Sequence, residues 1–226
     1  GNSYAGISSK TTWNFTTEDI TEPTVSSFSP LDNATNVLVG TDLAITFSEP
    51  VTVQSDSIWI KRSSDDSVFE GMPVTDGTRV TGGGTAAITI DPVATLEGET
   101  EYYVQIATSA FDDLAGNSYA GISDKITWSF TAEDIADPVV STYSPADNAI
   151  DVGINADLVL TFNEAVAAQS GDIRIRETDG DALFGTIAVT DVARVSGSGT
   201  AAITIDPTGT FDGETGYYVE IDAAGF

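Results

Sequence analysis

The sequence repeats itself at an offset of 115 residues, and this repeat constrains the fold more than any other feature. Residues 1–111 align with residues 116–226 without a gap, and 61 of these 111 positions are identical. The segment Gly1–Ser8 recurs unchanged as Gly116–Ser123. A period of this length is the size of a domain and too long for a solenoid unit, so we expect tandem copies of one domain.

Short runs of alternating apolar and polar residues predict that the repeated domain is all-β. Residues 43–47 alternate in this way, and Ile126, Trp128 and Phe130 are expected on one face of another run. Turn-forming residues separate these runs, and no stretch of ten residues carries an apolar stripe at helical spacing. Strands are expected near residues 24–28, 43–47, 57–61, 68–69, 73–76, 79–81, 86–90, 101–106 and 125–131. This spacing predicts tandem immunoglobulin-like Greek-key β-sandwiches of seven to nine strands, with Tyr102 or Tyr103 as a corner tyrosine.

The repeat also predicts the limits of the domains. Residues 1–19 correspond to the last strand and linker of a preceding copy, residues 20–134 to a complete domain, and residues 135–226 to a domain without its last strand. An open sheet edge is costly, and we expect Trp13 and Phe15 to be exposed. Two explanations stay open: the chain is a window on a longer array, or its first 17 residues complete the last domain of the next molecule by strand addition.

Composition excludes several kinds of functional site. The chain has no Cys and no His, which rules out thiolate nucleophiles, zinc–thiolate sites and Ser-His-Asp triads. With 35 acidic and 8 basic residues its net charge is -27, and such a surface repels nucleic acid and anionic membranes. No apolar run approaches the roughly 20 residues of a membrane span. We expect no enzymatic activity, no nucleic-acid partner and no membrane insertion.

Residues with side-chain oxygen atoms, most of them acidic, recur at the positions where an Ig-like sandwich brings its linker and two of its loops together. For the first complete domain these residues are Glu18, Asp19, Glu49, Asp112, Asp113 and Asn117, and the next junction repeats Glu133, Asp134 and Glu164. Calcium binds six to eight such oxygen atoms. The set therefore predicts a calcium ion that clamps adjacent domains, and the alternative is that these residues are solvated loop acids and Asx turns.

Three aromatic residues are candidates for binding a partner. Trp59 is expected to point outward between Ile58 and Ile60, and Trp13 and Phe15 are expected to be exposed in the first segment. An outward Trp contacts a partner, a glycan or a neighbouring chain, or else it packs over a local hairpin. These residues leave open a second function, a module that binds carbohydrate or a host surface, beside a third, an accessory domain of an enzyme.

Several motifs resemble the bacterial Ig-like domains of surface proteins. They are Pro-x-Val-x-x-x-Ser-Pro-x-Asp-Asn-Ala from Pro23 to Ala34, Leu-x-x-Thr-Phe-x-Glu from Leu43 to Glu49, Tyr-Tyr-Val-x-Ile from Tyr102 to Ile106, and Asp-x-x-Gly-Asn from Asp113 to Asn117. The resemblance is closest to the family first described in S-layer proteins and found in large repetitive adhesins, and it covers essentially the whole chain. It implies a location at the bacterial cell surface and a structural role as a spacer whose partners are neighbouring copies of the repeat. The resemblance does not by itself indicate a ligand, because these domains mostly act as spacers.

Overall fold

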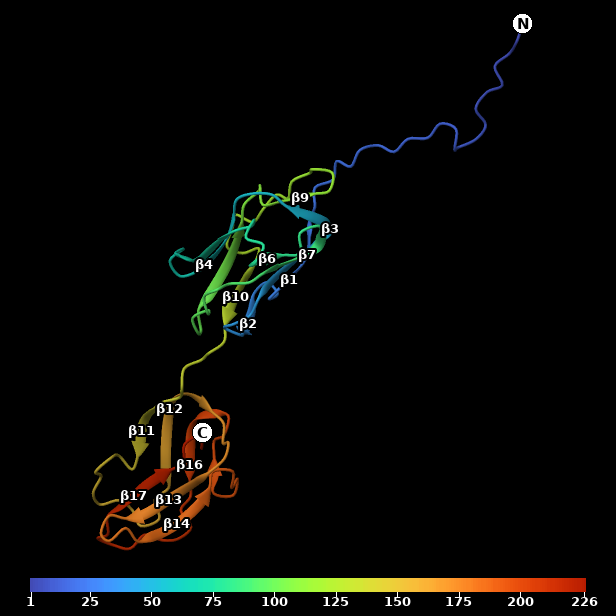
Figure 1. Cartoon of the computed structure of the whole chain (residues 1–226). Helices are drawn as coiled ribbons and strands as arrows, with labels where there is room; N and C mark the ends of the chain where they lie inside the picture. The colour runs from blue at the N-terminus through green and yellow to red at the C-terminus, as the bar shows by residue number, and fades with distance from the viewer. The chain divides into compact units, whose positions relative to one another are not determined.

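The computed structural model describes all 226 residues and contains strands, turns and loops only. The chain divides into two compact units, residues 1–135 and residues 136–226 (Figure 1). The predicted all-β fold is confirmed. No helix of the chain is long and apolar enough to cross a membrane.

The first unit is a sandwich of two five-stranded sheets. One sheet has the order β1-β3-β7-β6 with β9 on the side of β3, and the other has the order β2-β10-β8-β4-β5. The strands are β1 (Val25–Ser29), β2 (Ala34–Val37), β3 (Leu43–Val53), β4 (Ser57–Arg62), β5 (Val68–Pro73), β6 (Val80–Thr81), β7 (Thr85–Ile90), β8 (Glu101–Ile106), β9 (Phe111–Asp113) and β10 (Ser129–Ala132). All pairs are antiparallel except β2 with β10, which is parallel. The ten strands include two short ones, β2 and β9, that the sequence pattern did not predict.

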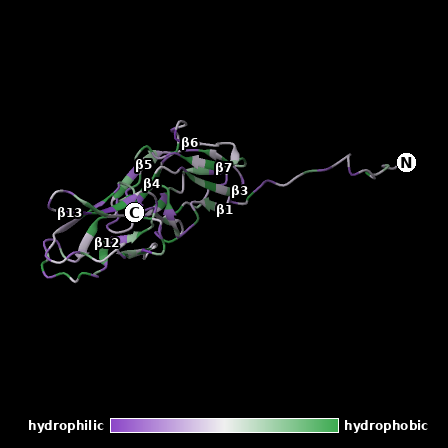
Figure 2. Cartoon of the chain, turned by 90° about the horizontal axis from the view of Figure 1, so that it is seen from below, coloured by the Kyte–Doolittle hydropathy of each residue, from purple (hydrophilic) through white to green (hydrophobic).

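The core of the first unit lies between these sheets and follows the period-two pattern of the strands. Every second residue of β3 from Leu43 to Phe47 is buried, and β8 buries Tyr102, Val104 and Ile106 on one face and also Tyr103 on the other. Figure 2 shows hydrophobic and hydrophilic residues mixed along the strands. Trp128 stacks on Phe28 with 4.6 Å between ring centroids, and its Nε1–H donates to the Pro30 carbonyl at 2.9 Å. The Tyr102 hydroxyl accepts a hydrogen bond from the Glu97 backbone N–H at 2.9 Å. Tyr102 is therefore the corner tyrosine.

Two expected strands are wrong in their extent. The last strand of the first unit starts at Ser129 instead of near residue 125, and Ile126 is 81% exposed. The Asp124 carboxylate accepts hydrogen bonds from the backbone N–H groups of Ile126 and Thr127, both at 2.8 Å, and this turn interrupts the alternation. Residues 74–76 form a turn and not a strand, because β5 extends to Pro73 and the chain reverses there.

The second unit has two smaller sheets, with the orders β11-β12-β16-β15 and β14-β13-β17. Its strands are β11 (Val140–Ser144), β12 (Leu158–Val166), β13 (Asp172–Glu177), β14 (Leu183–Ala188), β15 (Val195–Ser196), β16 (Thr200–Ile205) and β17 (Tyr217–Ile221). Phe226 is the counterpart of Phe111, the first residue of β9, and the counterpart of β10 does not fall within the 226 residues. The counterpart of β2, residues 149–152, forms no strand. The strand β17 therefore lies at a sheet edge, whereas its counterpart β8 lies inside a sheet.

The first 24 residues contain no strand. A turn in which the Thr12 N–H donates to the Ser9 carbonyl at 3.1 Å is the only regular feature that involves residues 1–17. Trp13 and Phe15 are 74% and 82% exposed. The segment that the repeat equates with a last strand therefore has no partner strand within this chain.

Candidate metal site at the loop end of the first unit

Three carboxylates from distant parts of the sequence meet at one end of the first unit. Asp19 lies in the segment before β1, Glu49 lies in β3, and Asp113 ends β9. One carboxylate oxygen from each residue lies within 4.8 Å of those from the other two. Figure 1 shows β3 and β9 at the end of the unit where the N-terminal segment enters. We refer to these three residues as the carboxylate cluster.

Asp113 is fixed by the loop that follows it. Its side chain is buried, and its Oδ1 accepts hydrogen bonds from the backbone N–H groups of Ala115 at 2.8 Å and Asn117 at 2.7 Å. Its Oδ2 accepts a hydrogen bond from the Asn117 side-chain amide at 2.7 Å. This Asx-type turn holds the carboxylate in one orientation at the tip of the β9 loop.

Glu49 reaches the cluster because β3 is irregular around it. The register between β3 and β7 shifts between Thr46 and Val51, so that Thr46 lies opposite Ala87 but Val51 lies opposite Thr85. The intervening residues of β3 form a bulge. Bulges redirect side chains away from the regular alternation of a strand.

Hydrogen bonds at Asp19 itself and at Thr24 hold this segment against the unit. The Asn117 side-chain amide donates to the Asp19 carbonyl oxygen at 3.2 Å. Further along, the Thr24 N–H donates to the Ser48 hydroxyl at 3.0 Å, and the Ser48 N–H donates to the Thr24 carbonyl at 2.7 Å. The entering chain therefore lies against the β3 bulge just before β1 begins.

The electrostatic environment of the cluster is unfavourable to three negative charges. Partial burial, and then the neighbouring charges of Asp113 and Asp19, raise the pKa of Glu49. Burial also opposes ionisation of Asp113, but the hydrogen bonds from Asn117, Ala115 and Gly116 outweigh it and leave the pKa of Asp113 below its ordinary value. No Lys or Arg forms an ion pair with any of the three carboxylates. A cation at this position would relieve the repulsion.

The separations suit a calcium ion. Ca²⁺–oxygen distances of about 2.3–2.6 Å allow two ligand oxygens to lie at most about 5 Å apart across the ion. The carboxylate oxygens of the cluster are all within 4.8 Å of one another, close enough that a small adjustment of the side chains would let one ion contact all three. Carboxylates are also the hard oxygen ligands that calcium prefers.

The structure brings together some of the predicted ligands of the first site and not the others. Glu18 is exposed and lies outside the cluster. Asp112 precedes Asp113 in a strand, so its side chain points to the opposite face, where it accepts a hydrogen bond from the Ser118 hydroxyl at 2.7 Å. Asn117 supports the cluster as a donor, because its amide nitrogen and not its oxygen faces Asp19 and Asp113.

The second predicted set is divided between the two units. Glu133 and Asp134 belong to the first unit, and Glu164 belongs to the second. The Glu133 carboxylate accepts a hydrogen bond from the Val39 N–H at 3.0 Å, at the end of the first unit where the chain leaves β10. Asn163 donates to the Glu164 carboxylate at 3.3 Å through its side-chain amide. A metal site formed by these three acids stays a prediction.

Trp59 lies on the outer face of β4, as its position between the buried residues Ile58 and Ile60 requires. It is half-buried and pairs across the sheet with Gly71 of β5. A side chain at Gly71 would place its Cβ 3.1 Å from the indole ring, so the glycine leaves room for the Trp. The ring thus covers the neighbouring strand, and its role in binding a partner stays a prediction.

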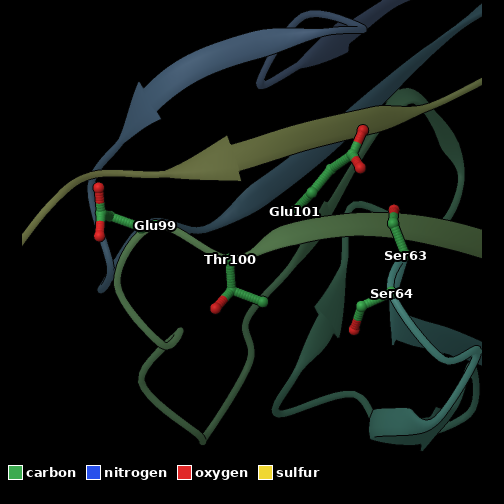
Figure 3. Close-up of a pocket in the computed structure, with 5 residues that line it drawn as sticks. All are labelled: Ser63, Ser64, Glu99, Thr100 and Glu101. Carbon is green, nitrogen blue, oxygen red and sulfur yellow. The ribbon is translucent and has the colours of Figure 1, made fainter.

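A shallow pocket of about 300 Å³ lies beside β8 and is lined by Ser63, Ser64, Glu99, Thr100 and Glu101. Figure 3 shows that these side chains do not converge: Glu101 and Ser63 point one way, and Thr100 and Ser64 point the other. Hydroxyl groups and carboxylates are present, but the arrangement does not aim a nucleophile and a base at a common point.

Comparison with known proteins matches the chain to one protein family. The family described as the bacterial Ig-like domain matches the sequence twice, over residues 19–132 and over residues 134–225. None of the curated proteins matches the chain. The two matches together cover nearly the whole sequence and correspond to the two units, which confirms the resemblance inferred from the sequence motifs.

Proposed function

The chain belongs to the bacterial Ig-like domain family, and from this premise we propose that it is a structural repeat of an extracellular bacterial surface protein. Such a repeat would serve as a spacer in an adhesin, an S-layer-type protein or a surface filament. The observation that carries the proposal is the pair of consecutive units with closely related sequences and the same family fold, which places similar modules in series. The role is mechanical and not catalytic, since each added unit lengthens the spacer.

The linker between the units supports a semi-rigid spacer. Only a few residues separate the end of β10 at Ala132 from the start of β11 at Val140, and Pro138 is among them. A short segment that contains proline has fewer accessible conformations than a long Gly-Ser linker. The linker itself therefore has limited conformational freedom.

Calcium bound at the carboxylate cluster would hold the segment that enters the first unit against the body of that unit. The ion would join Asp19, in the segment that enters the unit, to Glu49 and Asp113 within its body. It would also offset part of the charge of -27, which otherwise makes the units of an array repel one another. The spacer would then be stiff in calcium-rich surroundings and looser without it.

Thermal unfolding of the 226-residue chain with calcium and with EDTA tests this proposal. Calcium that binds only the folded state raises the melting temperature of the first unit, and several degrees are expected at millimolar concentrations. Binding should weaken as the pH falls, because Glu49 must be deprotonated to act as a ligand and its pKa is raised.

Glu49→Gln keeps the shape of the side chain and removes one ligand charge. This variant should lose the calcium-dependent rise, while Glu101→Gln, a change at an exposed acid outside the cluster, should keep it. An identical melting temperature in calcium and in EDTA for the unmodified chain would refute the calcium clamp.

A further inference from the structure

We infer that the outer face of β4 and β8 in the first unit binds a glycan whose sugar units carry carboxylates. Three outward side chains on these strands, Trp59, Lys61 and Gln105, form the binding surface, and we refer to them as the outer patch. The inference goes beyond the proposed function, because a spacer can carry such a patch or lack it. It does not require calcium.

The register of the sheet places the three residues of the outer patch together. Trp59 and Lys61 alternate in β4 with the buried residues Ile58 and Ile60, so both point away from the core. Gln105 of β8 lies directly opposite Trp59 in the antiparallel pair of β4 with β8. Side chains at opposite and diagonal positions on one face of a sheet are neighbours. One ligand can therefore contact all three.

The indole of Trp59 offers a partly exposed apolar surface and an N–H donor. The ring lies over Gly71 of β5, where a Cβ would be 3.1 Å from the indole Cδ1 and 3.4 Å from Nε1. Its Nε1–H has no hydrogen-bond partner in the chain. Every buried side-chain nitrogen and oxygen atom does have one, so this N–H is open to water. Such a ring can stack on the C–H face of a sugar while its N–H donates to a hydroxyl group.

The two polar members of the outer patch complement a sugar that carries a carboxylate. Six of the eight basic residues of the chain form ion pairs, and only Lys10 and Lys61 do not, although the chain has 35 acidic residues. The Gln105 amide nitrogen donates to the Ser123 carbonyl at 2.7 Å, which leaves the amide oxygen as an acceptor for a ligand hydroxyl. The Lys61 ammonium is available to bind the carboxylate.

The corresponding face of the second unit neutralises its own charges. Arg174 takes the place of Trp59, and its guanidinium forms ion pairs with Asp172 at 3.1 Å and with Asp222 at 2.5 Å. The face therefore has paired charges where the first unit has an aromatic ring.

The acids that neutralise this face of the second unit are absent from the first. Arg176, the counterpart of Lys61, pairs with Glu220 at 3.0 Å. The positions of the three acids, Asp172, Glu220 and Asp222, are taken in the first unit by uncharged residues, which are Ser57, Gln105 and Ala107. Lys61 is therefore left without the carboxylate that its counterpart has, and a ligand can supply one.

A glycan fits the outer patch better than an acidic peptide does. The patch has one unpaired cation beside an aromatic ring, so binding must draw on stacking as well as on charge. A sugar unit with a carboxylate presents an apolar ring face and a negative group at a fixed spacing. The side chains of Asp and Glu supply the charge without the ring.

Titration of the isotope-labelled 226-residue chain with a short oligogalacturonate, followed by NMR, tests the inference. The chain has three Trp residues and therefore three indole N–H signals, and the signal of Trp59 is identified by its loss in Trp59→Ala. This signal should shift as the oligosaccharide is added, whereas those of Trp13 and Trp128 should not. All measurements are made in EDTA, so that calcium cannot bridge carboxylates of the protein and the sugar.

Two substitutions separate the contribution of the ring from that of the charge. Trp59→Ala should raise the dissociation constant, measured by calorimetry, at least about tenfold, because it removes the stacking surface. Lys61→Gln should raise it about threefold, and this loss should shrink at high salt. Trp13→Ala and Lys10→Gln are matched controls, since they remove an exposed Trp and an unpaired Lys outside the patch and should leave the affinity unchanged. Urea transitions check that each variant is folded.

Three outcomes would overturn the inference. The first is a Trp59 signal that does not move up to the solubility limit of the oligogalacturonate. The second is equally tight binding of an uncharged galactose oligosaccharide, which would show that the carboxylate plays no part. The third is equally tight binding of polyglutamate, which would show that the patch accepts an acidic peptide. None of these results depends on the calcium clamp, because calcium is absent throughout.

Discussion

The two units have closely related sequences, yet one has a closed sandwich and the other an open one. In the first unit the sheet that contains β8 has five strands, whereas the corresponding sheet of the second unit has three. The core residue Val37 is buried, but its counterpart Val152 is 40% exposed. Residues 116–132 supply the last strand of the five-stranded sheet, and the 226 residues do not include the corresponding segment of the second repeat.

The comparison also shows that a strand can depend on its partner more than on its own residues. Residues 34–37 and 149–152 share the pattern Ala-x-x-Val, and only the first of them forms a strand. The strand β2 pairs with β10, with Ala34 opposite Phe130 and Val37 opposite Ala132. Without the counterpart of β10 the same segment has no partner, so its extended structure is a consequence of tertiary pairing.

The largest effect on stability is expected for a substitution that removes a buried contact of residues 116–132, the segment that closes the first unit. Trp128→Ala removes a fully buried side chain that stacks on Phe28, and it should lower the free energy of unfolding of the first unit by about 3–5 kcal/mol. Urea denaturation of the whole chain measures this loss, and the transition of the second unit should not move.

The control for that change is Ile126→Ala, which lies two residues away and is exposed. A surface substitution of this kind should change the stability by less than about 0.5 kcal/mol. Hydrogen exchange at residues 34–37 should also accelerate in the Trp128 variant. Full protection of that segment would contradict the view that β2 depends on β10.

A smaller difference is expected between the two corner tyrosines. The Tyr102 hydroxyl accepts from the Glu97 N–H, and the Tyr217 hydroxyl accepts from the Asp212 N–H, both at 2.9 Å. Tyr102 is fully buried and Tyr217 is not, so Tyr102→Phe should cost about 1–1.5 kcal/mol and Tyr217→Phe only about 0.5 kcal/mol. The losses of unfolding free energy are measured in the two urea transitions. Equal losses would show that the tyrosine hydrogen bond is as strong in the second unit as in the first.

The last effect is confined to alkaline solution, and near neutral pH this group contributes no pH dependence. Burial, and then the negative charge of Asp124, raise the pKa of Tyr119 to about 12. The folded state therefore holds this proton more tightly than the unfolded state, and the stabilisation it provides is present below pH about 10 and lost as the pH rises toward 12. Tyr119→Phe should remove this part of the pH dependence. Its counterpart Tyr4 is exposed, so Tyr4→Phe should leave the dependence intact.

Much of the fold could be predicted from the sequence because the buried strands carry a clear period of two. The strands near residues 43–47, 57–61 and 101–106 are confirmed, since their alternating apolar residues coincide with the two inner faces. The short strands β2 and β9 were not predicted, because they form by pairing with β10 and β3 and carry no clear alternation of apolar and polar residues of their own. The error at Ile126 has a local cause, the turn formed by Asp124, which competes with the strand.

The candidate site could be predicted only in part. The sequence identified the linker and loops that supply Asp19, Glu49 and Asp113, because an Ig-like sandwich brings those segments together. It could not show that Asp112 faces the other way or that Asn117 turns its amide nitrogen toward the carboxylates. Those details depend on the residue at which β9 ends and on the conformation of the loop that follows.

The parallel pairing of β2 with β10 has a consequence for a protein under tension. These two strands lie near opposite ends of the complete unit in the sequence, and they run in the same direction. A pull on the two ends draws them past each other along their length, so the hydrogen bonds between them bear the force together and do not open one after another. The last strand of the unit is therefore expected to resist stretching by shear against β2.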